Sequence, residues 1–543
     1  MATFNFGDLY DITAATVPDK VAIRYDGTSI TFAESAVRTD RIAAALHAAG
    51  VRRGDTVALH LHNVPAHIEA FIAACKLGAA PVNVNYRYQA AELDYLYDNM
   101  QVAALYVGAE FLAAALPVAQ RQSSLKVVVV VDGNPAELPP GVLDHATIAS
   151  DIALAPPPVE RRSDDLVILY TGGTTGMPKG VMWTHEDLFF SALGGGGYYS
   201  ALGPIAAPED LPERIRTGYP LTSLSLPPLM HAAAMWYCLI GLYAGQTAVL
   251  NPARHFDAEQ VFDLIIAESV NSIIIVGDAM ARPLAEALEA HPGRWDLSRL
   301  AMIGSGGAPL SAHLQTRLSG LLPNTRVMTS LGSSESGALG AGAPSPDGML
   351  RLAPRADLVV LMRVNEDGPE PGWRRAVVGE RGIISRWGRL PQGYLRDPQK
   401  TAATFAMVDG VRHAITGDEG RLEDDGGITL FGRGSTSINT GGEKVFPEEV
   451  EQVLRGHPAV LDAIVVGVPD PRWGEAVTAL VHRRTLEATD VDALRDYCRK
   501  ALAGYKVPKH VLFVDEVQRS PAGKADYPWG KRTARALLGL AAS

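Results

Sequence analysis

Hydrophobic positions in the first 135 residues follow two different periods. Short apolar runs typical of buried strands occur at residues 57–61, 81–84, 103–107 and 127–131. Between the first two runs, one face of a helix is marked by Ile68, Phe71, Ile72 and Cys75, and Gly78 is placed to end that helix. Strands that alternate with helices predict a mostly parallel sheet covered by helices.

The same alternation continues along the chain. Residues 261–266 predict a helix and residues 272–276 a buried strand, whereas the region 194–217, with its glycines, prolines and charges, predicts a surface excursion. The apolar stretch 232–245 is shorter than the ~20 residues that a membrane-spanning helix needs, so it predicts a buried helix. Near the C-terminus, two paired strands are predicted at 463–468 and 476–481.

Composition narrows the class of protein. With 543 residues, the chain is too long for one compact core, and two or more domains are expected. A net charge of −11 argues against nucleic acid as the main partner. The three cysteines are widely spaced and fit neither a disulfide framework nor a zinc site, which favours a reducing cytoplasm. We see no signal peptide at the N-terminus and no peroxisomal ending at the C-terminus.

The most informative stretch is Tyr-Thr-Gly-Gly-Thr-Thr-Gly-Met-Pro-Lys-Gly at 170–180, which follows a predicted strand at 166–170. Glycines let backbone N–H groups approach a polyphosphate, threonine hydroxyls donate hydrogen bonds, and a lysine supplies positive charge. The spacing is not that of a Walker loop. Glycines alone would favour a glycine-rich hairpin, but the ordered run of threonines, glycines, proline and lysine favours a phosphate-binding loop.

This loop resembles the phosphate-binding signature of the adenylate-forming superfamily, which includes acyl-CoA synthetases, luciferases and adenylation domains of peptide synthetases. Further similar motifs follow in the family's order across nearly the whole chain: Gly-Gly-Ala-Pro-Leu at 306–310, Leu-Gly-Ser-Ser-Glu at 331–335, Thr-Gly-Asp at 416–418, Gly-Arg-Gly-Ser at 432–435, Gly-Gly-Glu-Lys-Val at 441–445 and Pro-Ala-Gly-Lys at 521–524. Within the superfamily, the chain most resembles actinobacterial fatty-acyl and sterol-side-chain CoA ligases.

The resemblance implies a nucleotide site. Its residues would be Thr171, Gly172, Gly173, Thr174, Thr175, Gly176, Lys179, Gly307, Ala308, Pro309, Leu331, Gly332, Ser333, Ser334, Asp418 and Arg433. Leu331 stands where the family usually has an aromatic residue over the adenine, so ring stacking is lost although an aliphatic side chain still covers the base. Glu335 and Thr175 would hold Mg²⁺, for which a hard carboxylate is suited.

A second set of residues would serve the acyl group and CoA. It comprises His231, Trp236, Gly306, Gly441, Gly442 and Glu443. On sequence alone a lone histidine is more often structural than catalytic, and Trp236 fits a core aromatic nearly as well as an acyl gate. The resemblance also implies that Lys524, His231, Lys179 and Ser334 act in catalysis, with Lys524 contacting the carboxylate and the α-phosphate.

We therefore expect an α/β fold with two domains. Residues 1–433 would form a large multi-sheet domain that binds ATP and the acyl group, and residues 434–543 a small mobile α+β lid that carries Lys524 and a CoA-side loop. Ser435 replaces a charged hinge residue of many family members, although a hinge does not require charge.

The expected reaction is ATP-dependent activation of a fatty or bulky hydrophobic carboxylic acid through acyl-AMP, followed by acyl-CoA formation with release of AMP and pyrophosphate. ATP, Mg²⁺ and coenzyme A would be required. An alternative is transfer of the acyl group to an amine or a carrier-protein thiol, and a noncatalytic nucleotide sensor would be expected to lack Glu335 or Lys524. We expect no nucleic-acid partner, no integral membrane segment and a cytoplasmic location; homodimer formation is left open.

Overall fold

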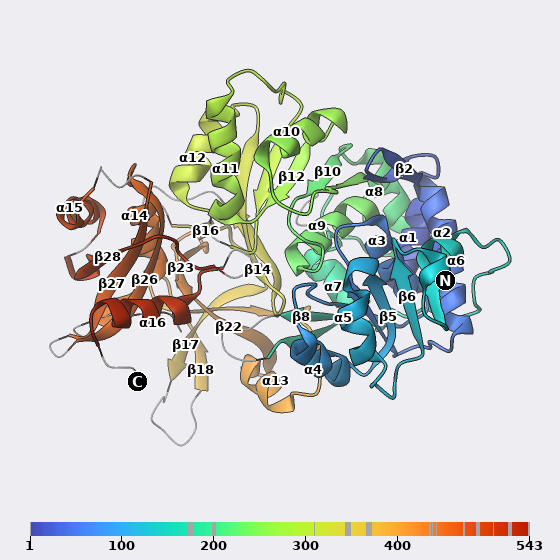
Figure 1. Cartoon of the computed structure of the whole chain (residues 1–543). Helices are drawn as coiled ribbons and strands as arrows, with labels where there is room; N and C mark the ends of the chain where they lie inside the picture. The colour runs from blue at the N-terminus through green and yellow to red at the C-terminus, as the bar shows by residue number, and fades with distance from the viewer. Residues whose placement is uncertain are drawn as a thin grey trace.

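The structure is a computed structural model of the chain, shown in Figure 1. It describes residues 2–171, 177–197, 202–308, 310–342, 349–364, 372–433, 436, 438–440, 443–470, 473–484, 489–502, 504–519 and 524–540. Within these ranges the strands form four sheets, and helices cover the faces of the two largest. The fold is α/β with several sheets and a small C-terminal domain, as the sequence predicts.

The first sheet is built mainly from the N-terminal third of the chain. Its strands, in spatial order, are β20 (Gly393–Tyr394), β9 (Lys179–Thr184), β8 (Leu166–Thr171), β4 (Ala80–Asn83), β3 (Thr56–His60), β5 (Val102–Gly108), β6 (Val127–Val131) and β7 (Val142–Asp144). The run from β8 through β4 to β7 is parallel, whereas β9 and β20 each pair antiparallel with the strand beside them. The predicted strands and their mostly parallel arrangement are confirmed.

The second sheet is assembled from two distant parts of the sequence. Its order is β15 (Gly337–Gly342), β14 (Arg326–Ser333), β13 (Met302–Ser305), β12 (Ser272–Ile275), β10 (Thr222–Ser225), β11 (Thr247–Leu250), β1 (Val21–Tyr25) and β2 (Thr28–Thr31). The strands from β14 to β1 are parallel, and an antiparallel strand lies at each edge. The N-terminal hairpin thus extends a sheet that otherwise begins after residue 220.

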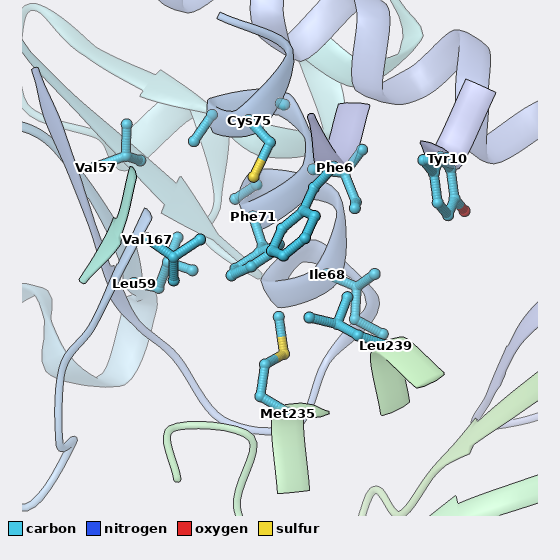
Figure 2. Packing of buried hydrophobic residues seen from close by; sticks show 14 of the residues in the cluster. Phe6, Tyr10, Val57, Leu59, Ile68, Phe71, Cys75, Val167, Met235 and Leu239 are labelled. Atoms are coloured by element: carbon cyan, nitrogen blue, oxygen red, sulfur yellow. The ribbon is translucent and has the colours of Figure 1, made fainter. Parts of the chain in front are cut away.

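The largest hydrophobic core lies between these two sheets. Helices fill this layer: α1 (Phe6–Thr16), α2 (Phe32–Ala48), α3 (Pro65–Lys76), α6 (His145–Ser150), α7 (His185–Ala192), α8 (Leu211–Thr217) and α9 (Ala232–Tyr243). In Figure 2 the rings of Phe6 and Phe71 lie side by side, 6.2 Å between centroids, with Met235 pointing toward them from α9. The predicted buried helix at 232–245 is confirmed.

Other helices cover the outer faces of the two sheets. Against the first sheet lie α4 (Ala90–Met100) and α5 (Ala109–Ala119), and against the second lie α10 (Ala258–Ala267), α11 (Gly277–Ala290) and α12 (Ala312–Leu321). Together these elements form a stack of helices, sheet, helices, sheet and helices. No helix among the described residues is long and apolar enough to span a bilayer.

Two further sheets follow. The third contains β16 (Arg351–Leu352), β23 (Ile428–Arg433), β22 (Val411–Leu422), β19 (Arg381–Trp387), β17 (Leu358–Val364) and β18 (Gly372–Arg375), with β21 (Phe405–Val408) beside β22 and α13 (Pro398–Thr404) before it. The fourth contains β25 (Glu443–Val445), β24 (Ile438–Thr440), β27 (Gly474–Arg483), β26 (Val460–Asp470) and β28 (His510–Val514). The antiparallel pair β26–β27 matches the predicted C-terminal strands.

The fourth sheet forms the small domain, orange to red in Figure 1. One face is covered by α14 (Pro447–Arg455) and α15 (Val491–Ala501), and the other by α16 (Tyr527–Leu537). Each face therefore has its own apolar core. The exact boundary between the large and small domains stays a prediction.

Candidate active site

The candidate residues gather where parallel strands of the second sheet end. β10, β13 and β14 run in the same direction, so their carboxyl ends share one edge. The segment with His231 follows β10, Gly306 follows β13, and Ser334 and Glu335 follow β14. Ligands of open α/β sheets bind outside this kind of edge. The sheet thus brings together residues that lie about a hundred positions apart.

Two asparagines attach this edge to the first sheet. Asn83, at the end of β4, donates to the carbonyl oxygens of Met230 (2.6 Å) and Tyr170 (3.1 Å), and its own oxygen accepts from the N–H of Tyr170 (2.8 Å). Asn63 donates to Pro227 O (3.1 Å) and accepts from Leu229 N (2.7 Å). The segment before His231 is thereby fixed to the strand that leads into the glycine-rich loop.

That loop begins and ends on paired strands. Thr171 of β8 lies opposite Lys179 of β9, so the two ends of the loop are held as neighbours. The Lys179 ammonium lies 3.3 Å from a carboxylate oxygen of Asp397 and 5.8 Å from the ring centre of Tyr394. The pKa of Asp397 is lowered, first by the N–H of Lys400 and then by Lys179. Lys179 is thus oriented by a carboxylate that a bound polyphosphate would have to displace or share.

Glu335 lies in the turn between β14 and β15, where two contacts fix the turn on the first sheet. The Tyr394 hydroxyl donates to Glu335 Oε1 at 3.0 Å, and the Trp183 indole N–H donates to the carbonyl oxygen of Ser334 at 2.7 Å. Burial, followed by the charge of Glu335, raises the pKa of Tyr394, so this hydroxyl keeps its proton and remains a donor. The Ser333 hydroxyl is engaged within the same turn by Ser336.

The carboxylate of Glu335 fits the role of a single protein ligand to Mg²⁺. The described residues contain no cluster of three or more histidine, cysteine or acidic side chains that could hold a metal by itself. Mg²⁺ is commonly held by one or two carboxylates together with substrate phosphates, so one positioned carboxylate beside a phosphate loop meets the requirement. Thr175, the second ligand that the sequence predicts, lies outside the described residues.

His231 and Trp236 carry buried polar atoms that need a partner. His231 is the residue that precedes α9, and Trp236 lies in its second turn. Both His231 Nε2 and Trp236 Nε1 are buried and make no hydrogen bond with the described residues. Buried polar atoms are usually satisfied, so two such atoms at the start of one helix indicate a place where a ligand supplies the partner.

The electrostatics of His231 link it to two cations. Its pKa is lowered to about 4, first by burial and then by the positive charges of Lys524 and Arg87. The imidazole is therefore neutral near pH 7. A neutral histidine with two cations nearby is suited to a carboxylate ligand, because the cations attract the anion and the imidazole can donate one hydrogen bond.

Little empty space exists beside this segment. An internal cavity of about 10 Å³ is lined by Leu59, His67, Phe71, Pro81, Asn83, Val167, Leu169, Leu229, Met230, Ala232 and Met235. This is about the room that one water molecule needs. An acyl chain in this region would therefore require side chains of α9 to move.

The candidate residues for the base lie on or just after β13 and β14 of the second sheet, whereas the candidate for the ribose lies on the third sheet. Gly307 is exposed, and its φ of +83° is a backbone conformation that residues with a side chain adopt only with strain. A Cβ added to Gly306 would lie 2.8 Å from Ser330 Oγ. The side chain of Leu331 packs against the core of the third sheet. Asp418 on β22 is buried and accepts from the Thr416 hydroxyl at 2.9 Å.

Several predicted residues cannot be placed. Those outside the described residues are Gly172, Gly173, Thr174, Thr175, Gly176, Pro309, Ser435, Gly441 and Gly442, and of the side chains of Arg433 and Glu443 nothing is described. Conversely, sequence reasoning did not assign Asn83, Arg87 or Asp397 to the site. Tyr394 was visible only as part of a family-like Gly-Tyr segment, whose pairing with β9 brings it to Glu335.

Known proteins were compared with the chain. Its residues 10–364 match the family model of the AMP-binding enzymes, and residues 449–524 match the model of the AMP-binding enzyme C-terminal domain. The chain belongs to the AMP-binding enzyme family.

Members of the AMP-binding enzyme family resemble the chain over nearly its full length. A medium/long-chain-fatty-acid–CoA/3-oxocholest-4-en-26-oate–CoA ligase of Mycobacterium marinum is 41% identical, over 98% of this chain and 97% of that protein. A 3-oxocholest-4-en-26-oate–CoA ligase of Rhodococcus rhodochrous is 40% identical, over 97% and 95%. The crystal structure of the anthranilate CoA ligase AuaEII with anthranoyl-AMP shares the fold, with a TM-score of 0.83 at 22% identity over 99% of both chains.

Proposed function

We propose that this AMP-binding enzyme is an ATP-dependent acid–CoA ligase that activates a fatty or bulky hydrophobic carboxylic acid as acyl-AMP. The acyl group then passes to the thiol of coenzyme A, with release of AMP and pyrophosphate. ATP, Mg²⁺ and coenzyme A are the nucleotide, the metal and the acceptor. The names of relatives at about 40% identity support an acid–CoA ligase with this class of acid.

The chemistry follows from the electrophile. A carboxylate has no good leaving group, whereas its mixed anhydride with AMP does. Forming that anhydride brings one anion to another, so positive charge must be supplied where the charges meet. Lys179 and Lys524 supply it from the protein, and Mg²⁺ at Glu335, when bound, neutralises phosphate oxygens. Asp397 and Tyr394 keep Lys179 and Glu335 in place.

One observation carries this proposal: the pairing of β20 with β9 places Tyr394 beside both Lys179, 5.8 Å from the ring centre, and Glu335, 3.0 Å from the hydroxyl. Lys524 belongs to the small domain, whereas His231 begins α9 in the large domain. After burial, the positive charge of Lys524 is one of the lesser causes that lower the pKa of His231, which supports a role for this lysine at the carboxylate site. Lys524 and His231 must come close together if the lysine is to contact the carboxylate and the α-phosphate while these two groups react.

Replacement of Lys524 by alanine tests the proposal. Acid-dependent ATP–pyrophosphate exchange should fall by about 10²–10³-fold, which is typical for removal of one preorganised charged contact. Lys531→Ala, a change at an exposed lysine of α16, is the matched control and should exchange like the wild type. Exchange in Lys524→Ala within a few-fold of wild type would refute the assignment.

The acceptor requires a separate measurement. Incubation of acid and ATP with CoA, and in parallel with amino acids, distinguishes thioester from amide by product mass. We expect a thioester only. Amide formation at a comparable rate would support the alternative of an amide-forming ligase. A panel of medium-chain, long-chain, aromatic and steroid acids would then define the acyl group.

We place this reaction in the cytoplasm. All three cysteines, Cys75, Cys238 and Cys498, are buried and unpaired, as is usual for proteins of reducing compartments.

A further inference from the structure

A line of four charged residues crosses from the large domain into the small one. Its members, in order of contact, are Asp278, Arg455, Asp462 and Arg519. Asp278, in the first turn of α11, lies 3.6 Å from the guanidinium of Arg455, the last residue of α14. In Figure 1 these two helices are neighbours at the junction of the domains. The side chains are almost fully buried, with 10% and 4% of their surface exposed.

On the large-domain side, Asp278 is tied to the nucleotide edge. Its Oδ1 accepts a hydrogen bond of 2.7 Å from the N–H of Ser311. Ser311 caps α12 and follows the Gly-Gly-Ala-Pro-Leu segment that contains Gly307 and Ala308. A shift of Asp278 would therefore move the turn at 306–310, which is proposed to contact the adenine.

On the small-domain side, Arg455 connects to the segment that carries Lys524. Its guanidinium lies 3.8 Å from Asp462, and Asp462 accepts two hydrogen bonds of 2.7 Å each from Arg519. Arg519 in turn forms a β-bridge with Ala525. Ala525 directly follows Lys524, so the bridge ties the backbone beside Lys524 to Arg519.

Arg455 and Asp462 favour their charged forms although burial opposes both of these forms. Burial would lower the pKa of Arg455, but Asp278, Glu451 and Asp462 outweigh it and the net shift is upward. Likewise Arg519 and Arg455 overcome burial and lower the pKa of Asp462. Glu451 gives Arg455 a second partner within the small domain, at 3.2 Å. Arg455 therefore remains paired inside its own domain if Asp278 is withdrawn.

We propose that Asp278 and Arg455 are positioning residues for acyl-AMP formation. Their contact across the domains, passed on through Asp462 and Arg519, holds Lys524 at the carboxylate site. The pair is made in the arrangement that forms acyl-AMP and is released when the small domain moves for thioester formation. This role rests on the ligase function proposed above.

Asp278→Asn is the test, because asparagine keeps the acceptor for Ser311 and removes the charge. Acid-dependent pyrophosphate exchange should lose about tenfold in kcat, in keeping with coupling carried through a charged network. Conversion of supplied acyl-AMP and CoA to thioester should be unchanged or faster. Glu286→Gln is the matched control: it lies on the same helix and pairs with Arg484 of the small domain at 2.8 Å, but outside the line to Lys524.

Different results overturn different claims. Equal loss of both half-reactions in Asp278→Asn, or the same selective loss in Glu286→Gln, would overturn the positioning role and leave the ligase function standing. If Asp278→Asn fails to fold, Arg455→Lys, which keeps the charge without the planar fork, provides the same comparison of half-reactions. Wild-type protein without pyrophosphate exchange would refute the ligase function, and the positioning role with it.

Discussion

At the scale of single residues, the candidate site depends on neutral side chains that hold a charged group or the backbone in place. The Tyr394 hydroxyl holds Glu335, and the Asn83 amide joins the carbonyl groups of Tyr170 and Met230. A hydrogen bond to a charged group contributes about 1.5–3 kcal/mol. Small changes at these neutral partners should therefore have measurable effects on the groups they hold.

Tyr394→Phe should weaken the use of Mg²⁺. Loss of the hydroxyl leaves Glu335 without its fixed donor, so we expect the Mg²⁺ concentration for half-maximal pyrophosphate exchange to rise about tenfold. At saturating Mg²⁺ the rate should largely recover. Tyr97→Phe, which also removes a buried hydroxyl but lies away from the site beside His60, is the control. An unchanged Mg²⁺ dependence would mean that Glu335 does not meet the metal.

The sequence predicted the charged candidates but few of their partners. Glu335, Lys179 and Lys524 belong to motifs whose residue types suit phosphate chemistry. Tyr394 lies 59 residues from Glu335, and Asn83 lies 147 residues from Met230. Such partners become neighbours only through strand pairing between distant segments, and local patterns carry no information about it.

At the scale of elements, the secondary-structure predictions were most accurate where one hydrophobic period continued over a whole segment. The strand at 127–131 and the buried α3 positions Ile68 and Phe71 are as expected. The other faces of α3 are buried as well, with His67, Glu69 and Lys76 among the buried residues, which the apolar period did not predict.

The prediction that residues 194–217 form a surface excursion was partly wrong. In this region α8 buries Leu211 and Ile215, two apolar residues that are four apart among charges and too few for a clear signal.

Helix α9 offers a test of acyl selectivity. Trp236 is partly buried against the main core, and the neighbouring cavity is too small for an acyl chain. Trp236→Ala should raise kcat/KM for steroid acids relative to medium-chain acids by about tenfold if Trp236 borders the acyl group, since loss of the indole leaves room for a bulkier acid.

The control is Leu239→Ala in the same helix. Leu239 is fully buried, so its loss should destabilise the fold by about 2–5 kcal/mol while leaving the ranking of acids as in the wild type. If Trp236→Ala also left that ranking unchanged, Trp236 would be a core residue only.

At the scale of the whole molecule, buried histidines make stability depend on pH. Burial is the main cause that lowers the pKa of His60, His67 and His231 to about 4, and that of His185 to about 3. Unfolded histidine takes up its proton near pH 6.5. The unfolded chain therefore binds more protons between pH 6.5 and 4, and the folded state loses stability as pH falls through that window.

Urea unfolding at pH 7.5 and pH 5 checks this. Each such histidine should remove about 1–2 kcal/mol of stability at pH 5, so the wild-type midpoint should drop clearly. His67→Gln should make the drop smaller, whereas a change at the exposed His255 to Gln should leave it as in the wild type. Equal midpoints at the two pH values would show that these histidines are protonated without penalty.

The two-residue strand β20 has a consequence for synthesis of the chain. It covers the outer side of β9, yet more than two hundred residues separate the two strands. In a chain emerging from the ribosome, β9 can pair with β8, but the backbone groups on its outer edge stay unpaired until Gly393 and Tyr394 appear. Uncovered strand edges invite pairing with other chains, so products that stop before residue 393 should depend on chaperones to remain dispersed.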